Sequence, residues 1–188
     1  MLFYQENLII DLKNYMKIIS TKKTRISKWV SLINNLVEEK KKKFEYHSLK
    51  INDYASIIAI TQKNEIVLVE QFRPAVNKKT LELPGGIVEK NNSPIDVAKR
   101  ELLEETGFKV NGKLEKLGKI DIDYGRISNK AYGFFAKNVI FDELYNVEEN
   151  IKTILMPKKK FFYNILNNNF NHSPHLSFVL IAKMKNLF

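Results

Sequence analysis

The sequence contains no cysteine, and this absence removes several classes of protein from consideration. Disulfide-stapled domains, cysteine-ligated zinc sites, iron–sulfur proteins and thiol enzymes all require that residue. Histidine is almost as rare: the chain has only His47, His172 and His175, and their spacing does not match a histidine-based metal motif. The sequence therefore points away from sulfur and histidine chemistry.

Arginine is scarce within a strongly basic chain. The 31 Lys and Arg residues outnumber the 21 Asp and Glu residues, the net charge is +10, and the only arginines are Arg25, Arg73, Arg100 and Arg126. Arginine is preferred for bidentate recognition of phosphates and base edges, whereas lysine acts as a point charge. Lys, Asn and Ile are also the residues that an AT-rich coding sequence favours. We therefore interpret the excess charge as solvated lysine and expect no nucleic-acid partner, with an acidic substrate or a nucleic-acid surface as the alternatives.

Long hydrophobic runs are absent, because no stretch approaches the roughly 20 apolar residues of a membrane helix. Residues 1–20 carry Glu6, Asp11 and Lys13 among their apolar residues and lack the pattern of a secretory signal. Their apolar positions recur at helical spacing, which predicts a short amphipathic helix that docks on the body or on a second subunit. We expect a cytoplasmic protein without membrane association.

The length of 188 residues and a hydrophobic content of 44% suit one domain that buries its own core. The basic run 38–43 predicts an exposed turn or helix end. Strands are expected over 44–51, 57–61, 65–71, 80–83, 114–122, 131–137 and 151–156, and helices over 94–105, 157–166 and from 173 onward. The strands over 57–61 and 65–71 are expected to form a β-hairpin, and a sharp turn is expected at residues 84–86. Because strands and helices do not alternate strictly, this order favours an α+β or layered α/β/α fold.

The helix expected over 94–105 has the clearest boundary signals. Ser93 is a favourable N-cap, Pro94 suits the first helical position, and Asp96 stands where a capping box places its acidic residue. Gly107 follows where a left-handed C-terminal stop is expected.

This helix carries four charged residues near its end. At about 100° per residue, Glu101, Glu104 and Glu105 project from one face, and Arg100 can pair with Glu104 one turn away. Like charges repel one another, but clustered carboxylates are the hard oxygen ligands that Mg²⁺ or Mn²⁺ prefers, with substrate phosphates completing the shell. Taken alone, the same residues also fit a solvated acidic face.

Residues 86–108 read GIVEKNNSPIDVAKRELLEETGF and resemble the Nudix box. Gly86 matches its first position, the block from Arg100 to Phe108 matches its second half, and Asn92 is the one departure, standing where the family has Glu. The resemblance implies an α+β Nudix fold, with a mixed β-sheet sandwiched between helices (α/β/α) and an N-terminal antiparallel β extension.

The resemblance also implies a set of metal ligands. Glu101, Glu105 and the main-chain carbonyl of Gly85 would hold Mg²⁺, with Mn²⁺ as a substitute, and Glu104 would assist. Divalent cations neutralise a pyrophosphate and make water more acidic. Asn92 brings no charge, so its presence could weaken metal affinity.

Residues 69–89 read VEQFRPAVNKKTLELPGGIVE and resemble the ADP-ribose pyrophosphatase branch of that family. By this resemblance Arg73 would contact the pyrophosphate or the terminal ribose, and Glu82 would steady the active-site loop. The alternative for Arg73 is a surface salt bridge.

Two downstream segments are similar to loops of the same branch. Residues 123–129, including Arg126, would line the substrate cleft, and Glu149 in the acidic segment 148–150 would activate or position water. Glu148 is the alternative for that role, and an exposed acidic loop without a catalytic role is the other interpretation.

The segment before the hydrolase core also resembles that branch. This resemblance implies an N-terminal extension over 1–50, expected to be a dimerisation segment, and a Nudix hydrolase domain over 51–188. Trp29, the single tryptophan, is the candidate platform for an adenine base, with a core or dimer-interface position as the alternatives.

Together these features predict a Mg²⁺-dependent homodimeric enzyme that hydrolyses a nucleoside diphosphate linked to another moiety, with ADP-ribose giving AMP and ribose 5-phosphate. One alternative is a Nudix hydrolase acting on another nucleotide-sugar or dinucleotide. The other is a Nudix protein that binds a nucleotide or RNA without cleaving it.

Overall fold

The computed structural model describes residues 16–188, and the chain divides into two compact units. The small unit comprises residues up to Ile51 together with Gly125–Ile127, and the large unit comprises Asn52–Tyr124 and Ser128–Phe188. Most of the helix predicted within residues 1–20 lies outside the described residues. Its last residues, from Lys17 onward, form a strand, because pairing with the next strand overrides the local helical spacing.

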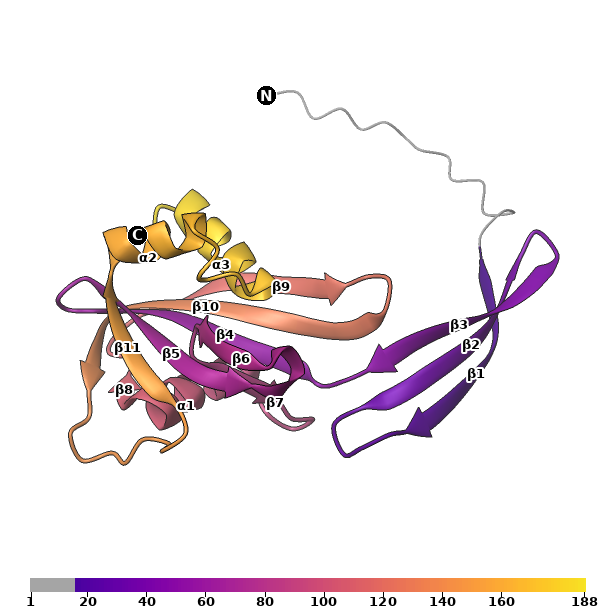
Figure 1. Ribbon diagram of the computed structural model, residues 1–188, viewed down its shortest axis with the longest axis horizontal. Helices are drawn as coiled ribbons and strands as arrows, with labels where there is room; N and C mark the ends of the chain where they lie inside the picture. The colour runs from indigo at the N-terminus through magenta and orange to yellow at the C-terminus, as the bar shows by residue number, and fades with distance from the viewer. Residues whose placement is uncertain (1–15) are drawn as a thin grey trace, which may run out of the picture. The chain divides into compact units, whose positions relative to one another are not determined.

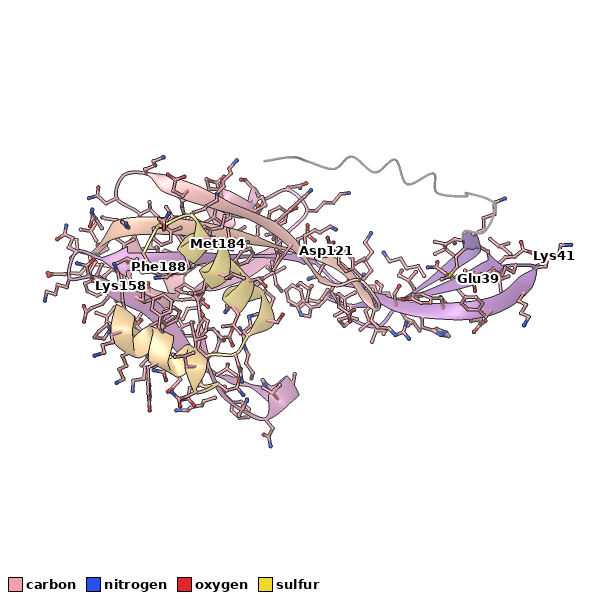
Figure 2. All side chains as sticks on the ribbon, turned by 90° about the horizontal axis from the view of Figure 1, so that it is seen from above. Glu39, Lys41, Asp121, Lys158, Met184 and Phe188 are labelled. Atoms are coloured by element: carbon pink, nitrogen blue, oxygen red, sulfur yellow. The ribbon has the colours of Figure 1, made fainter. Side chains whose placement is uncertain are left out.

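The small unit contains a three-stranded antiparallel meander. Its strands are β1 (Lys17–Arg25), β2 (Ser31–Glu39) and β3 (Lys42–Lys50). The predicted basic turn is the β2–β3 connection, where Lys40 and Lys41 take positive φ angles of 49° and 67°. Figure 2 labels Glu39 and Lys41 at this end of the hairpin.

Little of this meander is buried. Val37, 5% exposed, is the one buried residue among residues 16–51, and β1 is exposed along its whole length. Cross-strand pairing places Ile18, Val37 and Phe44 in one row across the three strands. Paired residues share a face of the sheet, so this row forms an apolar stripe on it.

The large unit is built on a mixed sheet whose central order is β10-β4-β5-β11. The bounds of these strands are β4 (Asp53–Thr61), β5 (Glu65–Arg73), β10 (Ile127–Phe141) and β11 (Lys152–Pro157). Strands β4 and β10 run parallel, whereas β5 is antiparallel to both β4 and β11. The first residue of β10 belongs to the small unit, where Ile127 pairs with Leu49.

Four shorter or flanking strands complete this sheet. They are β6 (Lys78–Glu82) beside β5, β7 (Gly85–Val88) beside β4, and β8 (Phe108–Lys109) and β9 (Leu114–Asp123) beside β10. A turn of 3-10 helix at Pro74–Val76 joins β5 to β6.

Helices cover both faces of the sheet, with α2 (Lys158–Leu166) and α3 (Ser173–Met184) on one and α1 (Pro94–Thr106) on the other (Figure 1). Alternate residues of β4 enter two separate apolar clusters, as strand geometry requires. Ile57 packs in the cluster that contains Leu102 of α1, and Ile58 packs in the cluster that contains Phe178 of α3. This arrangement confirms the predicted α+β fold with a mixed sheet between helices.

Two local predictions need correction. Ser93 caps α1 without a side-chain hydrogen bond, so the predicted capping box is wrong, although Gly107 does stop the helix with a φ of 73°. The sharp turn predicted at residues 84–86 is also wrong in part, because Gly85 and Gly86 begin strand β7. A side chain at Gly85 would overlap the carbonyl oxygen of Ala55, so the close approach of β4 explains this glycine.

No helix in residues 16–188 has both the length and the apolar composition needed to span a membrane.

Candidate active site

Helix α1 presents the predicted acidic residues beside its apolar stripe, and two of them, Glu101 and Glu105, meet strand β7. Val97, Ala98 and Leu102 are fully buried against the sheet, which fixes the rotation of the helix about its axis. This rotation leaves Glu101 and Glu104 at the surface, with side chains 14% and 29% exposed.

Glu105 is the buried member of the group. It is 5% exposed, and its Oε2 accepts a hydrogen bond of 3.0 Å from the Gly85 amide of β7. The pKa of Glu105 is raised to about 8, chiefly by burial and also by the charges of Glu101 and Glu148, against the opposing effect of the Gly85 hydrogen bond. The fold therefore holds the Glu105 carboxyl group where its ionised form is destabilised, as is common at functional sites.

Glu101 lies directly against the glycine strand. A side chain at Gly86 would displace the Glu101 carboxylate, so glycine at the first position of the box leaves room for that carboxylate against β7. Burial raises the pKa of Glu101, the charge of Arg100 opposes this, and Glu104 and Glu148 add to it. The Glu101 carboxylate is thus held between α1 and β7.

Arg100 binds two of the carboxylates at once. Its Nη2 lies 2.7 Å from Glu101 Oε1, and its Nη1 pairs with Glu104 Oε2 one turn along the helix. A half-exposed guanidinium offsets the repulsion between like charges on this face. Arg100 therefore orients the acidic cluster, as its position beside Glu104 predicts.

The donor atoms of this cluster fit a hard divalent cation. In residues 16–188 no three His, Asp or Glu side chains converge closely enough to hold a metal ion unaided. Mg²⁺ is usually bound through one or two carboxylates plus water and substrate phosphates, so a complete protein cage is not required. Ionisation of Glu105 is unfavourable beside the charge of Glu101, and a bound cation would stabilise the ionised form.

Arg73 and Glu82 are brought together by the pairing of β5 with β6. Arg73 Nε and Nη2 each donate to a Glu82 oxygen at 2.8 Å, and Thr80 Oγ1 donates to Oε1 at 2.6 Å. Burial alone would raise the pKa of Glu82, but these hydrogen bonds outweigh it and hold the pKa below its usual value. Arg73 remains 42% exposed, so the salt bridge leaves part of the guanidinium open to a ligand.

The acidic segment between β10 and β11 meets α1 through Glu148. Its amide donates to the Glu104 carbonyl at 3.1 Å, and its charge raises the pKa of both Glu101 and Glu105. Glu149, the residue favoured by sequence, follows in the same segment, and both glutamates are exposed. The structure thus places the charge of Glu148 at the cluster.

The other two predicted site residues belong to the small unit. Trp29 lies in the β1–β2 connection, 44% exposed, with Lys28 Nζ 4.4 Å from its ring centroid. The alternative that placed Trp29 in the core is therefore wrong. Arg126 lies over the ring of Tyr46 at 5.0 Å, and the Tyr46 hydroxyl bonds to the Gly125 carbonyl.

Comparison with known proteins places this arrangement in a family. The NUDIX domain matches residues 51–154, more than half of the chain. The chain belongs to the Nudix family. The membership predicted from residues 86–108 is confirmed.

Curated relatives of this Nudix protein match parts of it. An ADP-ribose pyrophosphatase from Bacillus subtilis (strain 168) is 30% identical over 96 residues, 50% of this chain and 51% of that protein. An ADP-sugar pyrophosphatase from Mus musculus is 42% identical over 64 residues, 32% of this chain and 29% of that protein. A methanol dehydrogenase activator from Bacillus methanolicus is 49% identical over 53 residues, 28% of this chain and 29% of that protein. The chain thus spans about half the length of these relatives or less.

A solved structure supports the fold of this Nudix protein. A crystal structure described as an ADP compounds hydrolase matches with a TM-score of 0.78, covering 90% of this chain and 92% of that chain at 19% identity. At that identity the match establishes the fold alone.

Sequence reasoning missed one group of residues near this site. The buried His175 and the half-buried Tyr54 form a hydrogen-bonded pair, with 3.0 Å between Tyr54 Oη and His175 Nε2, and His175 also contacts Leu83 just before β7. The two residues are 121 positions apart, so no local pattern links them. The signal available was a lone histidine within an otherwise apolar helix.

Proposed function

We propose that this Nudix protein is a Mg²⁺-dependent pyrophosphohydrolase that cleaves a nucleoside diphosphate linked to another moiety, with ADP-ribose as its substrate. Water adds across the phosphoanhydride, and the products are AMP and ribose 5-phosphate. The observation that carries the proposal is the buried Glu105 carboxylate beside Glu101 on α1, held against the Gly85 strand. The named ADP-ribose and ADP-sugar pyrophosphatases among its relatives support the choice of substrate.

Glu101, Glu105 and the Gly85 carbonyl would hold the magnesium. When bound, Mg²⁺ neutralises the charge of the pyrophosphate and makes water more acidic. Ionised Glu105 is favoured once a cation is present, which explains why the fold keeps a carboxylate buried there.

The side chains around this pair supply the proton transfer and the remaining charge. Glu104, or a carboxylate of the 148–150 segment, accepts the proton of the attacking water. Glu148 suits this role because its amide is bonded to Glu104, and Glu149 lies next to it. Arg73, held by Glu82, offsets the negative charge that develops on the phosphate oxygens.

A substrate panel tests this proposal. ADP-ribose, other nucleotide-sugars, FAD and dinucleoside polyphosphates are incubated with the protein and Mg²⁺, and released phosphomonoester is measured. We expect ADP-ribose to have the highest kcat/KM. A preference for another member of the panel would move the proposal to that substrate within the same chemistry.

A non-catalytic binding protein is the second candidate, and Asn92 is the observation that favours it. Asn92 is exposed in the turn before α1, where its backbone N–H donates to the Glu89 carbonyl. Its side chain adds no charge to the cluster. No turnover on the whole panel, together with salt-sensitive RNA binding, would support this candidate over the enzyme.

We also propose that residues 1–50 form a homodimerisation segment. The described strands of this segment bury only Val37, and they expose the apolar stripe of Ile18 and Phe44. A three-stranded sheet needs a covered hydrophobic face to be stable, and a second copy would cover this one. Trp29 is proposed to stack on the adenine or to join that interface, because its ring is exposed.

A further inference from the structure

The chain changes strand partners just before the glycines of the site. Strand β6 pairs with β5, whereas β7 pairs with β4. Leu83 and Pro84 lie between these two ladders and form the crossing from one to the other. The Leu83 amide is buried there and has to find a partner elsewhere, because an unpaired buried amide is costly.

At this crossing, Leu83, Pro84 and Gly85 each have one backbone group that is hydrogen-bonded to a different element. The Leu83 amide donates to His175 Nδ1 of α3 at 3.2 Å. The Pro84 carbonyl accepts from the Ile57 amide of β4 at 3.0 Å. The Gly85 amide donates to Glu105 Oε2 of α1, also at 3.0 Å. The anchor from α3 therefore lies two residues before the contact that holds Glu105.

His175 is built to act as an acceptor at this point. It is fully buried, and because Nδ1 accepts from Leu83, Nε2 carries the proton and donates to Tyr54 Oη at 3.0 Å. The ring also stacks on Phe170, with 6.0 Å between centroids. Burial keeps the pKa of His175 well below its usual value, so the ring stays neutral and Nδ1 stays free to accept.

We propose that His175 is a positioning residue of the active site. Its Nδ1 takes the place of the missing strand partner of Leu83 and so fixes where Gly85 meets Glu105. The consequence for metal binding and turnover rests on the proposed function, whereas the effect on the Leu83 and Gly85 amides does not.

A pair of amide substitutions separates the two ring nitrogens. In His175→Asn the side-chain oxygen can replace Nδ1 and accept from Leu83, whereas in His175→Gln the amide reaches toward Tyr54 instead. Phe178→Leu is the matched control, because Phe178 is fully buried on the same helix but lies against Gly133. It shares the apolar cluster of Leu83 but takes no part in the hydrogen bonds of the crossing, so its substitution should lower stability and leave those bonds in place.

Two measurements read out the position of the crossing without relying on turnover. Hydrogen exchange of the Leu83 and Gly85 amides is followed by NMR, and Mn²⁺ affinity is followed by electron paramagnetic resonance. We expect His175→Gln to speed exchange at both amides and to weaken Mn²⁺ binding about tenfold, the usual size for losing an outer support of a metal site. His175→Asn should restore both, and Phe178→Leu should change neither.

Turnover then separates the inference from the proposed function. With ADP-ribose, His175→Gln should lower kcat more than it raises KM, whereas a wild-type protein without turnover would overturn the function and leave the exchange test in place. Equal exchange and equal Mn²⁺ affinity in wild type and a folded His175→Gln would overturn the inference, as would equal losses in His175→Gln, His175→Asn and Phe178→Leu. Should His175→Gln fail to fold, His175→Leu is judged by the same criteria.

Discussion

The two units use strands of equal length in opposite ways. Strands β2 and β4 both have nine residues, yet β4 is buried over its last seven residues whereas β2 buries only Val37. The difference lies in what covers them: β4 has α1 on one face and α2 and α3 on the other. Strand pairing is present in both units, but burial of a strand requires further layers on the faces of the sheet.

The two units also differ in the side chains that they offer. Carboxylates with raised pKa values belong to the large unit, where packed helices can hold them in costly positions. The described strands of the small unit offer exposed apolar side chains, which suit the association proposed above. Substitutions in each unit can therefore break or sharpen the comparison.

The largest effect is expected at Glu105. Replacing Glu105 by Gln keeps an acceptor for the Gly85 amide but removes the charge that a cation needs, so turnover of ADP-ribose should fall about 1,000-fold. Asp96→Asn, which removes an exposed charge from the same helix, is the control and should keep full activity. Normal turnover in Glu105→Gln would remove chemistry from this face of α1.

The same substitution should stabilise the protein when chelator removes divalent cations. Folding raises the pKa of Glu105 from 4.5 to about 8, so ionisation of Glu105 costs native stability progressively as the pH rises between these values. Urea unfolding in EDTA should show Glu105→Gln more stable than wild type by on the order of 5 kcal/mol at pH 9, and equal to it near pH 4. Mg²⁺ at pH 9 should stabilise the wild type only. An unchanged difference across this range would mean that Glu105 is not held in a costly position.

The acidic segment gives the next effect. Glu148→Gln should lower kcat by about 30-fold, within the range for loss of a proton acceptor, because the charge of Glu148 already reaches the cluster. Glu149→Gln is the matched neighbour and should have a smaller effect in the same assay. The reverse order would restore the assignment that the sequence favours.

The smallest effect is expected in the small unit. Phe44→Glu places a charge in the apolar stripe and should weaken the dimer at least about tenfold in sedimentation equilibrium, since a buried Phe contributes about 1.5–3 kcal/mol. Glu45→Gln, on the opposite face of β3, should leave the dimer intact. A protein that is monomeric before any substitution would refute the dimer and confine the role of this unit to a single chain.

Most of the fold could be predicted from local patterns. The hairpin of β4 and β5, the end of α1 at Gly107 and the last two helices all follow from hydrophobic period and helix stops. The failures come where tertiary pairing overrides local preference. Residues from Lys17 onward pair as a strand instead of forming a helix, and Gly85 joins a strand because β4 leaves no room for a side chain.

The candidate site likewise combines features that local sequence predicts with features that depend on tertiary packing. The spacing of Glu101, Glu104 and Glu105 places them on one face of a helix whatever the rest of the chain does, because helical geometry is local. Which of them is buried, which pairs with Arg100, and which meets Gly85 depends on the rotation of α1 against the sheet. The placement of the 148–150 segment beside α1 likewise depends on tertiary structure, since the Glu148 amide donates to the Glu104 carbonyl.

The sequence by itself determined the family, the layered α+β class and the helix that carries the acid residues, since each rests on contiguous residues or short periods. Only the tertiary structure decided that Glu105 is buried, that Arg73 forms a salt bridge with Glu82 and that His175 accepts a hydrogen bond from Leu83. These contacts join residues far apart in the chain, and the dielectric and hydrogen-bond partners that set their chemistry exist only once the layers have packed.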